Sequence, residues 1–182
     1  MERTPLIDAH CHLDFAGNAV ELAAAYAACG GALSGTCDPR DFDRVCAMLA
    51  PYAPRVRVGL GLHPWWVADG TCGEGEVALF ERLAPAASLI SEVGLDFQPR
   101  RADTRDAQIE AFERVCVAAA RPSAEFPRRI MSIPVSYTHL RTVHWTVRLV
   151  RNSLCGRHRS HLPSSGLRQY NPQRSKRCRN AP

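Results

Sequence analysis

The amino-acid sequence predicts an α/β fold of about four βα units, which corresponds to half of a (β/α)8 barrel. Over the first 121 residues, short apolar runs alternate four times with longer alanine-rich amphipathic stretches. This alternation implies parallel strands that are joined by right-handed crossovers, as in a doubly wound sheet or a barrel. The barrel is favoured because His10, His12, His63 and Glu92 fall at or just after strand ends, where a barrel gathers its active site.

The elements follow from the same pattern. We expect strands at Leu6 to His10, Gly31 to Cys37, Val56 to Leu62 and Leu89 to Val93. Helices are expected at about residues 18–29, 41–52, 74–83 and 104–121. Gly30 and Gly31 mark the end of the first helix, and side-chain oxygens of Asp38 and of Asp103-Thr104 are placed to cap the backbone N–H groups of later helices.

The composition changes abruptly near residue 121. Residues 1–121 carry 11 arginines against 17 acidic residues, a net charge of −6, whereas residues 122–182 carry 12 basic residues and one acid, a net charge of +11. Alanine falls from 23 residues in the first part to 2 in the second. We therefore expect a barrel-forming segment over residues 1–121, followed by a non-native or disordered basic tail over residues 122–182.

Cysteine spacing and hydropathy indicate the compartment. The eight cysteines are irregularly spaced without a Cys-x-x-Cys pair, which is typical of reduced thiols that serve as small packing residues. No apolar run resembles the core of a signal peptide or approaches the ~20 residues that span a bilayer. We expect a cytoplasmic protein without a membrane segment, and the sequence indicates no protein partner.

The strongest chemical signal is the run Asp8-Ala9-His10-Cys11-His12-Leu13. Residues two apart on a strand point to the same face, about 6.6 Å apart along the chain, so both imidazoles can reach one cation. Neutral imidazole binds zinc and suits several other divalent metals. The alternative is a pair of histidines that are only hydrogen-bonded at a strand edge.

The second signal is the run from Ser91 to Phe97, which contains Glu92 and Asp96. A carboxylate at the end of the buried strand can bridge two cations about 3.5–4 Å apart, although taken alone Glu92 is more typical of a salt bridge or a cap. Asp96 is either an acceptor that orients a ligand histidine or a turn residue.

The third signal is Gly59-Leu60-Gly61-Leu62-His63-Pro64-Trp65, a strand that ends in a histidine held extended by the following proline. His63 is expected either to contact substrate or a metal ligand, or to close the barrel end through hydrogen bonds. The pair Trp65-Trp66 is a candidate for stacking on a base, although local packing is the commoner role of such a pair.

In their order, these motifs and the later run Gln108-Ile109-Glu110-Ala111-Phe112 resemble the amino-terminal half of the TatD family, over roughly residues 4 to 121. The resemblance implies a truncated TIM barrel of the amidohydrolase-like, metal-dependent hydrolase type, whose complete form has about 250 residues. It implies a deoxyribonuclease that cleaves phosphodiester bonds of DNA. It also implies His10, His12 and Glu92 as ligands of one or two divalent ions, without distinguishing Mg, Mn and Zn.

The family pattern fails after the fourth helix. Pro134-Val135-Ser136-Tyr137-Thr138-His139 has one residue too many before the histidine, and on a strand this turns His139 to the wrong face. The segment instead resembles the translation of a transposase-end adaptor, and we expect the sequence around it to be out of frame. We therefore expect this chain to fold weakly and to show little activity.

Two alternatives to a deoxyribonuclease remain open. Amidohydrolase-like barrels use a His-x-His strand for amide and ester hydrolysis as well, and the fold does not choose the substrate. The chain can also be an inactive fragment whose basic tail binds nucleic acid non-specifically through charge.

Overall fold

A computed structural model describes residues 4–121, 123, 126 and 129–133. The described residues belong to one compact unit. His139 and nearly all of the expected basic tail lie outside the described residues, so the expectations about them stay predictions.

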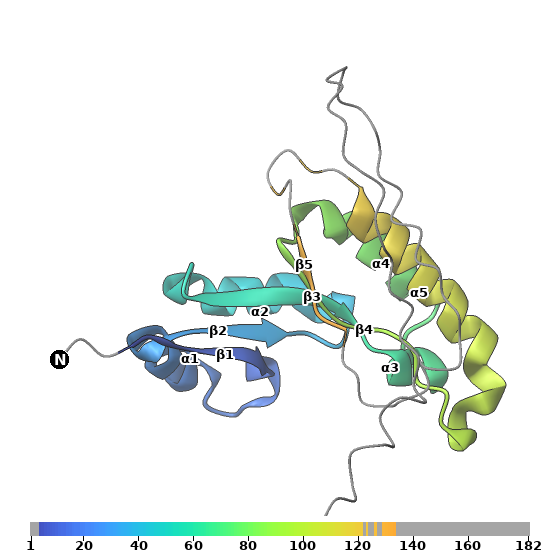
Figure 1. Cartoon of the computed structure of the whole chain (residues 1–182), viewed down its shortest axis with the longest axis horizontal. Helices are drawn as coiled ribbons and strands as arrows, with labels where there is room; N and C mark the ends of the chain where they lie inside the picture. The colour runs from blue at the N-terminus through green and yellow to red at the C-terminus, as the bar shows by residue number, and fades with distance from the viewer. Residues whose placement is uncertain (1–3, 122, 124–125, 127–128, 134–182) are drawn as a thin grey trace, which may run out of the picture. The chain divides into compact units, whose positions relative to one another are not determined.

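The described chain forms one five-stranded parallel sheet (Figure 1). The strands, in sheet order, are β1 (Leu6–Cys11), β2 (Gly30–Gly35), β3 (Val56–Leu62), β4 (Leu89–Val93) and β5 (Ile130–Met131). Each strand pairs in parallel with the next one along the chain. Because sheet order equals chain order and helices connect the strands, the fold is the truncated (β/α)8 barrel that the sequence predicts.

The fifth strand differs from expectation, because it lies in the segment that composition assigns to the tail. Backbone pairing with β4 holds it, and the Met131 side chain packs against the core. The Ser132 N–H donates to the Ile90 carbonyl at 2.8 Å, and Ile130 pairs with Leu89. The barrel-forming part therefore extends past residue 121 in this structure.

The four expected helices are present as α1 (Ala19–Cys29), α2 (Phe42–Leu49), α4 (Glu74–Leu83) and α5 (Arg105–Ala120). Short 3-10 turns lie at Leu13–Phe15, Pro39–Asp41, Ala50–Tyr52, Ala84–Ala86 and Pro99–Thr104. An unexpected helix, α3 (Pro64–Ala68), starts directly after β3. Its first residue is a proline, which suits the first helical position, and the His63 ring accepts a hydrogen bond from the Trp65 N–H.

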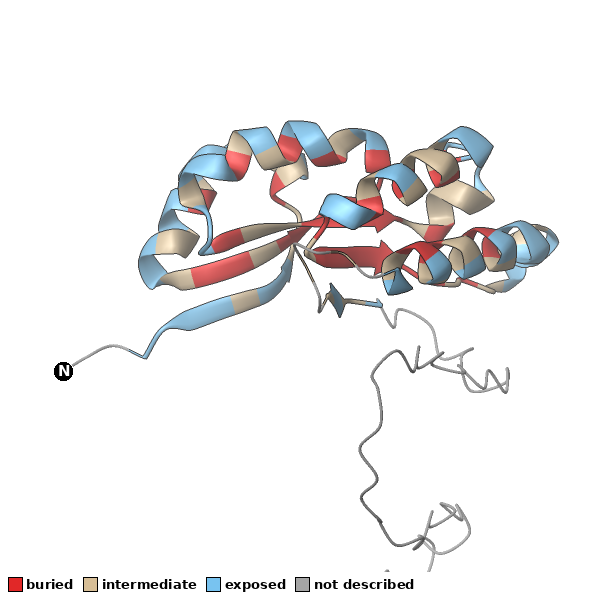
Figure 2. Ribbon diagram, turned by 90° about the horizontal axis from the view of Figure 1, so that it is seen from above, coloured by how far each residue is buried: buried red, intermediate tan, exposed pale blue. Residues whose placement is uncertain are grey.

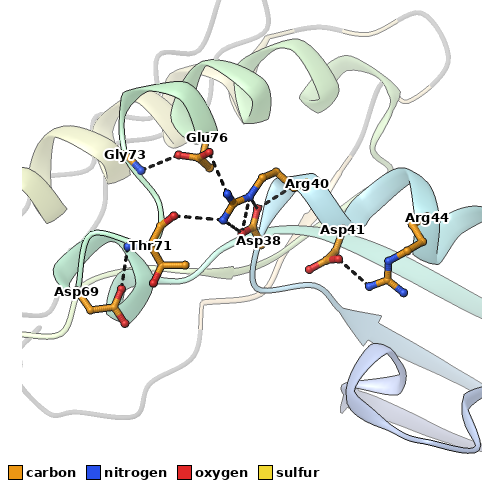
Figure 3. A network of polar contacts seen from close by, with 8 residues as sticks. All are labelled: Asp38, Arg40, Asp41, Arg44, Asp69, Thr71, Gly73 and Glu76. Atoms are coloured by element: carbon orange, nitrogen blue, oxygen red, sulfur yellow. Dashed lines mark hydrogen bonds and ion pairs between the residues drawn. The ribbon is translucent and has the colours of Figure 1, made fainter.

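The predicted cap at Asp38 belongs to a polar network that fixes the turn after β2 (Figure 3). The buried Asp38 carboxylate accepts the Arg40 N–H at 2.8 Å, and its oxygens also bind the Arg40 guanidinium. The same guanidinium donates to the Thr71 carbonyl and pairs with Glu76 of α4. The predicted cap at Thr104 is wrong, because its hydroxyl donates to a carbonyl of the preceding turn instead.

Glycine lets the strands approach closely at two junctions. At Gly30, which ends α1 as predicted, an added Cβ would lie 2.1 Å from the Leu6 carbonyl oxygen. At Gly61, an added Cβ would lie 1.6 Å from the carbonyl oxygen of Thr36. The Thr36 hydroxyl also accepts the Gly61 N–H, so β3 and the end of β2 meet with no room for a side chain.

Burial is uneven across the sheet (Figure 2). Strands β2 to β4 lie under the helices and carry the core, whereas β1 exposes Leu6 by 72% and Ile7 by 67%. Ile130 of β5, on the opposite edge, is 51% exposed. An open apolar groove of about 480 Å³ runs beside β1 and α1. These are the edges that further barrel strands would cover.

Candidate metal centre

The structure brings the three predicted ligands together at the carboxyl ends of the strands. His10 lies near the end of β1, His12 follows that strand, and Glu92 lies on β4; one ligand atom from each residue falls within 4.8 Å of the others. Nε2 of His10 lies 3.2 Å, and Nε2 of His12 3.8 Å, from Oε1 of Glu92. In a flat sheet the first and fourth strands would be about 14 Å apart. The curl of the sheet therefore assembles the site.

The backbone of Glu92 is distorted in a way that re-aims its side chain. Gly61 pairs with Ser91 and Leu62 pairs with Val93, so Glu92 is skipped in the register of β3 and β4. Its φ is 51°, in the left-handed region that residues other than glycine seldom adopt. Backbone strain of this kind clusters at functional sites, because the surrounding structure must hold it in place.

The surroundings of the Glu92 carboxylate suit a cation. Its side chain is almost fully buried, and Oε1 has no hydrogen-bond partner among the described residues, because the neighbouring His10 ring is close but not in hydrogen-bonding geometry. A buried carboxylate oxygen without a partner is costly. Two imidazole nitrogens and one carboxylate form a donor set that zinc and other divalent metals accept.

The His12 ring is held in the tautomer that a metal ligand needs. Its Nδ1 lies 2.9 Å from the carbonyl oxygen of Gly35, which can only accept, so Nδ1 carries the hydrogen. In the neutral ring, Nε2 then presents its lone pair on the side of Glu92. Metal-ligating histidines usually have such a carbonyl partner on the other ring nitrogen.

Comparison with known proteins identifies the family of the chain. The family model of TatD related DNases matches residues 7–124. The chain belongs to the TatD family. A solved TatD homologue, YjjV from Escherichia coli K12, superposes with a TM-score of 0.45 and 23% sequence identity, covering 61% of this chain and 48% of YjjV. The chain thus spans about half the length of that homologue. None of the curated proteins matches the chain.

In this TatD-family chain, the His63 ring lies beside the centre and turns one ring nitrogen toward Glu92. Because its Nδ1 accepts the Trp65 N–H at 3.1 Å, the neutral ring carries its hydrogen on Nε2, which lies 3.7 Å from Oε2 of Glu92. Burial, with the neighbouring His12 ring and the positive charge of Arg101, lowers the pKa of His63 from 6.5 to about 4. His63 is therefore neutral at pH 7 and presents an N–H toward the centre.

Asp96 supports the loop after β4. Its backbone N–H and carbonyl both pair with the buried side-chain amide of Gln108, at 2.8 and 3.0 Å. Its carboxylate accepts the Gln98 N–H and pairs with Arg101 at 3.1 Å. The sequence left two roles open for Asp96, that of an acceptor that orients a ligand histidine and that of a turn residue. These contacts correspond to the turn residue. Gln108 and Arg101 are contributors to the site's frame that sequence reasoning missed, although Gln108 lies in the family-like run.

The six described cysteines are free. Burial raises the pKa of Cys37, which lies beyond the end of β2, to about 12. Among the described helices, none is long and apolar enough to cross a bilayer. The compartment itself stays a prediction.

Proposed function

We propose that the TatD-family barrel to which this chain contributes hydrolyses phosphodiester bonds of DNA with the help of one or two divalent cations. The observation that carries the proposal is the buried Glu92 Oε1, which lacks a hydrogen bond among the described residues and lies 3.2 and 3.8 Å from the Nε2 atoms of His10 and His12. Family membership supports the same function.

A cation held by His10, His12 and Glu92 would polarise a phosphoryl oxygen and lower the pKa of a water molecule. The chain's own residues prepare the site for it. The Gly35 carbonyl fixes the His12 ring, and the bulge fixes the Glu92 carboxylate, so neither group must reorganise when substrate arrives.

We assign to His63 the role of stabilising the negative charge that develops on the phosphoryl oxygens during the reaction. Its Nε2–H points toward the centre, and the low pKa keeps the ring neutral, so it neither repels a cation nor gives up its hydrogen at pH 7. A fixed N–H donor beside a reacting phosphate stabilises charge that grows on the phosphoryl oxygens.

Turnover of a DNA oligonucleotide and of a cyclic amide, each with and without a chelator, tests the proposal. We expect metal-dependent cleavage of the phosphodiester only, and we expect His12→Gln to abolish it. Arg82→Gln, at an exposed position in the last turn of α4, is the matched control. Because the chain spans about half of YjjV, the rate will be low, and enzyme in excess over substrate is needed.

Each outcome has a distinct meaning. Cleavage that survives both the chelator and His12→Gln would rule out the metal centre as the source of activity. Preferred hydrolysis of the amide would move the chain to the other amidohydrolase-like chemistry. Binding of DNA without hydrolysis of either substrate would favour the remaining alternative, in which the chain is an inactive fragment whose basic tail binds nucleic acid.

A further inference from the structure

The segment after β4 carries three arginines within six residues, here called the arginine cluster: Arg100 and Arg101 lie in the turn before α5, and Arg105 is the first residue of that helix. The guanidinium carbons of Arg100 and Arg101 lie 5.9 and 4.7 Å from the centre of the Trp65 ring. Arg105 lies 4.5 Å from the centre of the Phe97 ring. Aromatic rings thus restrain all three cationic groups.

The three arginines differ in what else they contact. Arg101 is largely buried and paired with the buried carboxylate of Asp96, so it serves as the anchor of the loop. Arg100 and Arg105 are exposed, and neither forms an ion pair with a carboxylate of the described chain. Two positive charges of the arginine cluster therefore have no acidic partner among the described residues.

Short contacts link the cluster to the candidate metal centre. The Trp65 ring, on which Arg101 lies, packs edge-on against the His63 ring with the ring centres 5.0 Å apart. His63 in turn lies 3.7 Å from Glu92. Arg100 and Arg101 are thus separated from the carboxylate that would hold a cation by one aromatic ring and one imidazole, and Arg105 lies on the same segment of the chain.

We propose that the arginine cluster is a subsite for the phosphate groups of a nucleic acid strand, next to the phosphodiester at the metal centre. A guanidinium that stacks through its face keeps its N–H edge free for the paired hydrogen bonds that phosphate accepts. Because the rings already restrain Arg100 and Arg105, less side-chain entropy is lost when phosphate binds. The inference rests on the proposed function, because it takes nucleic acid as the ligand.

The test measures binding of a labelled single-stranded oligodeoxynucleotide to the full chain by fluorescence anisotropy, in the presence of a chelator, as a function of salt. The variants are Arg100→Gln, Arg105→Gln and both together, with the exposed Arg82→Gln of α4 as the charge-matched control. The basic tail is present in every variant, so its contribution cancels.

Each lost phosphate contact should make the slope of log affinity against log salt shallower by about 0.7. For the double variant, the affinity lost between roughly 50 and 200 mM salt should then be about sevenfold smaller than for the unaltered chain. Arg82→Gln should leave the slope unchanged.

An unchanged slope in the double variant, or an equal change in Arg82→Gln, would overturn the subsite. The measurement excludes metal and needs no turnover, so it separates the two proposals. A shallower salt slope without hydrolysis would support the phosphate subsite and contradict the proposed hydrolase function. Hydrolysis with an unchanged salt slope would support the hydrolase function and contradict the subsite.

Discussion

Replacing Glu92 by glutamine tests whether the buried carboxylate is there to hold a cation. The substitution keeps the shape of the side chain and removes its charge. Without metal we expect the free energy of unfolding to change by less than about 1 kcal/mol, because Oε1 has no hydrogen bond to lose among the described residues.

With metal the two chains should differ clearly. Glu92 contributes the anionic member of a three-residue donor set, so its loss should weaken affinity by at least the ~100-fold that changes outside the ligand shell can cause. A cation present at about 100 times its dissociation constant stabilises the unaltered chain by about 2.7 kcal/mol. The variant would gain only about 0.4 kcal/mol at that concentration, a difference of about 2.3 kcal/mol.

The assay is urea unfolding followed by circular dichroism, with a chelator and then with Zn²⁺ or Mn²⁺. Glu21→Gln, which removes an exposed carboxylate from α1, is the control and should keep the full stabilisation by metal. If metal stabilises Glu92→Gln as strongly as the unaltered chain, the carboxylate is not a ligand and the reasoning from its missing hydrogen bond fails.

Three further predictions concern the frame of the site. Gly61→Ala should lower the free energy of unfolding by about 3 kcal/mol or more, since its Cβ would overlap a backbone carbonyl, whereas Gly75→Ala, in open space on α4, should raise it by about 0.5 kcal/mol. Equal urea midpoints for the two variants would contradict the close approach of β3 to the end of β2. Arg40→Ala should destabilise the chain more than Arg44→Ala, because Arg40 pairs with a buried carboxylate and Arg44 with a more exposed one; reversed thermal midpoints would refute this. Because the pKa of His63 is lowered from 6.5 to about 4, its contribution to stability is complete above pH 6.5 and is lost as the pH falls to 4. That loss of stability is roughly 3 kcal/mol. His63→Asn keeps an acceptor for the Trp65 N–H and removes the titrating ring. In this variant the free energy of unfolding should fall less between pH 6.5 and pH 4 than in the unaltered chain.

The fold can be predicted from sequence where the pattern is long enough to show a period. The four long helices and four strands are identifiable because burial imposes spacing on the chain. Helix α3 escapes prediction because five residues are too few to show a helical period, so the proline at its start indicates only the extended backbone that it imposes on His63. Strand β5 escapes because two residues paired through the backbone leave no pattern of side chains.

The site can be predicted only in part for a similar reason. The two histidines at the end of β1 are neighbours in sequence, so strand geometry alone places them on one face. The strand pattern marks Glu92 as a carboxylate at a strand end, but its meeting with the histidines depends on the curl of the sheet and on the bulge at Glu92, which spacing along the chain does not determine. The pairing of Asp96 with Arg101 depends on how the loop folds back, which spacing does not determine.

The reach of Glu92 across two intervening strands has a mechanical consequence. An ion bound there would tie the outermost strand, β1, to β4, and it could do so only at one curvature of the sheet. The affinity for the metal ion should therefore depend on the curvature of the sheet. A change that flattens the sheet at Gly61, remote in sequence from all three ligands, should loosen the ion as surely as the loss of a histidine.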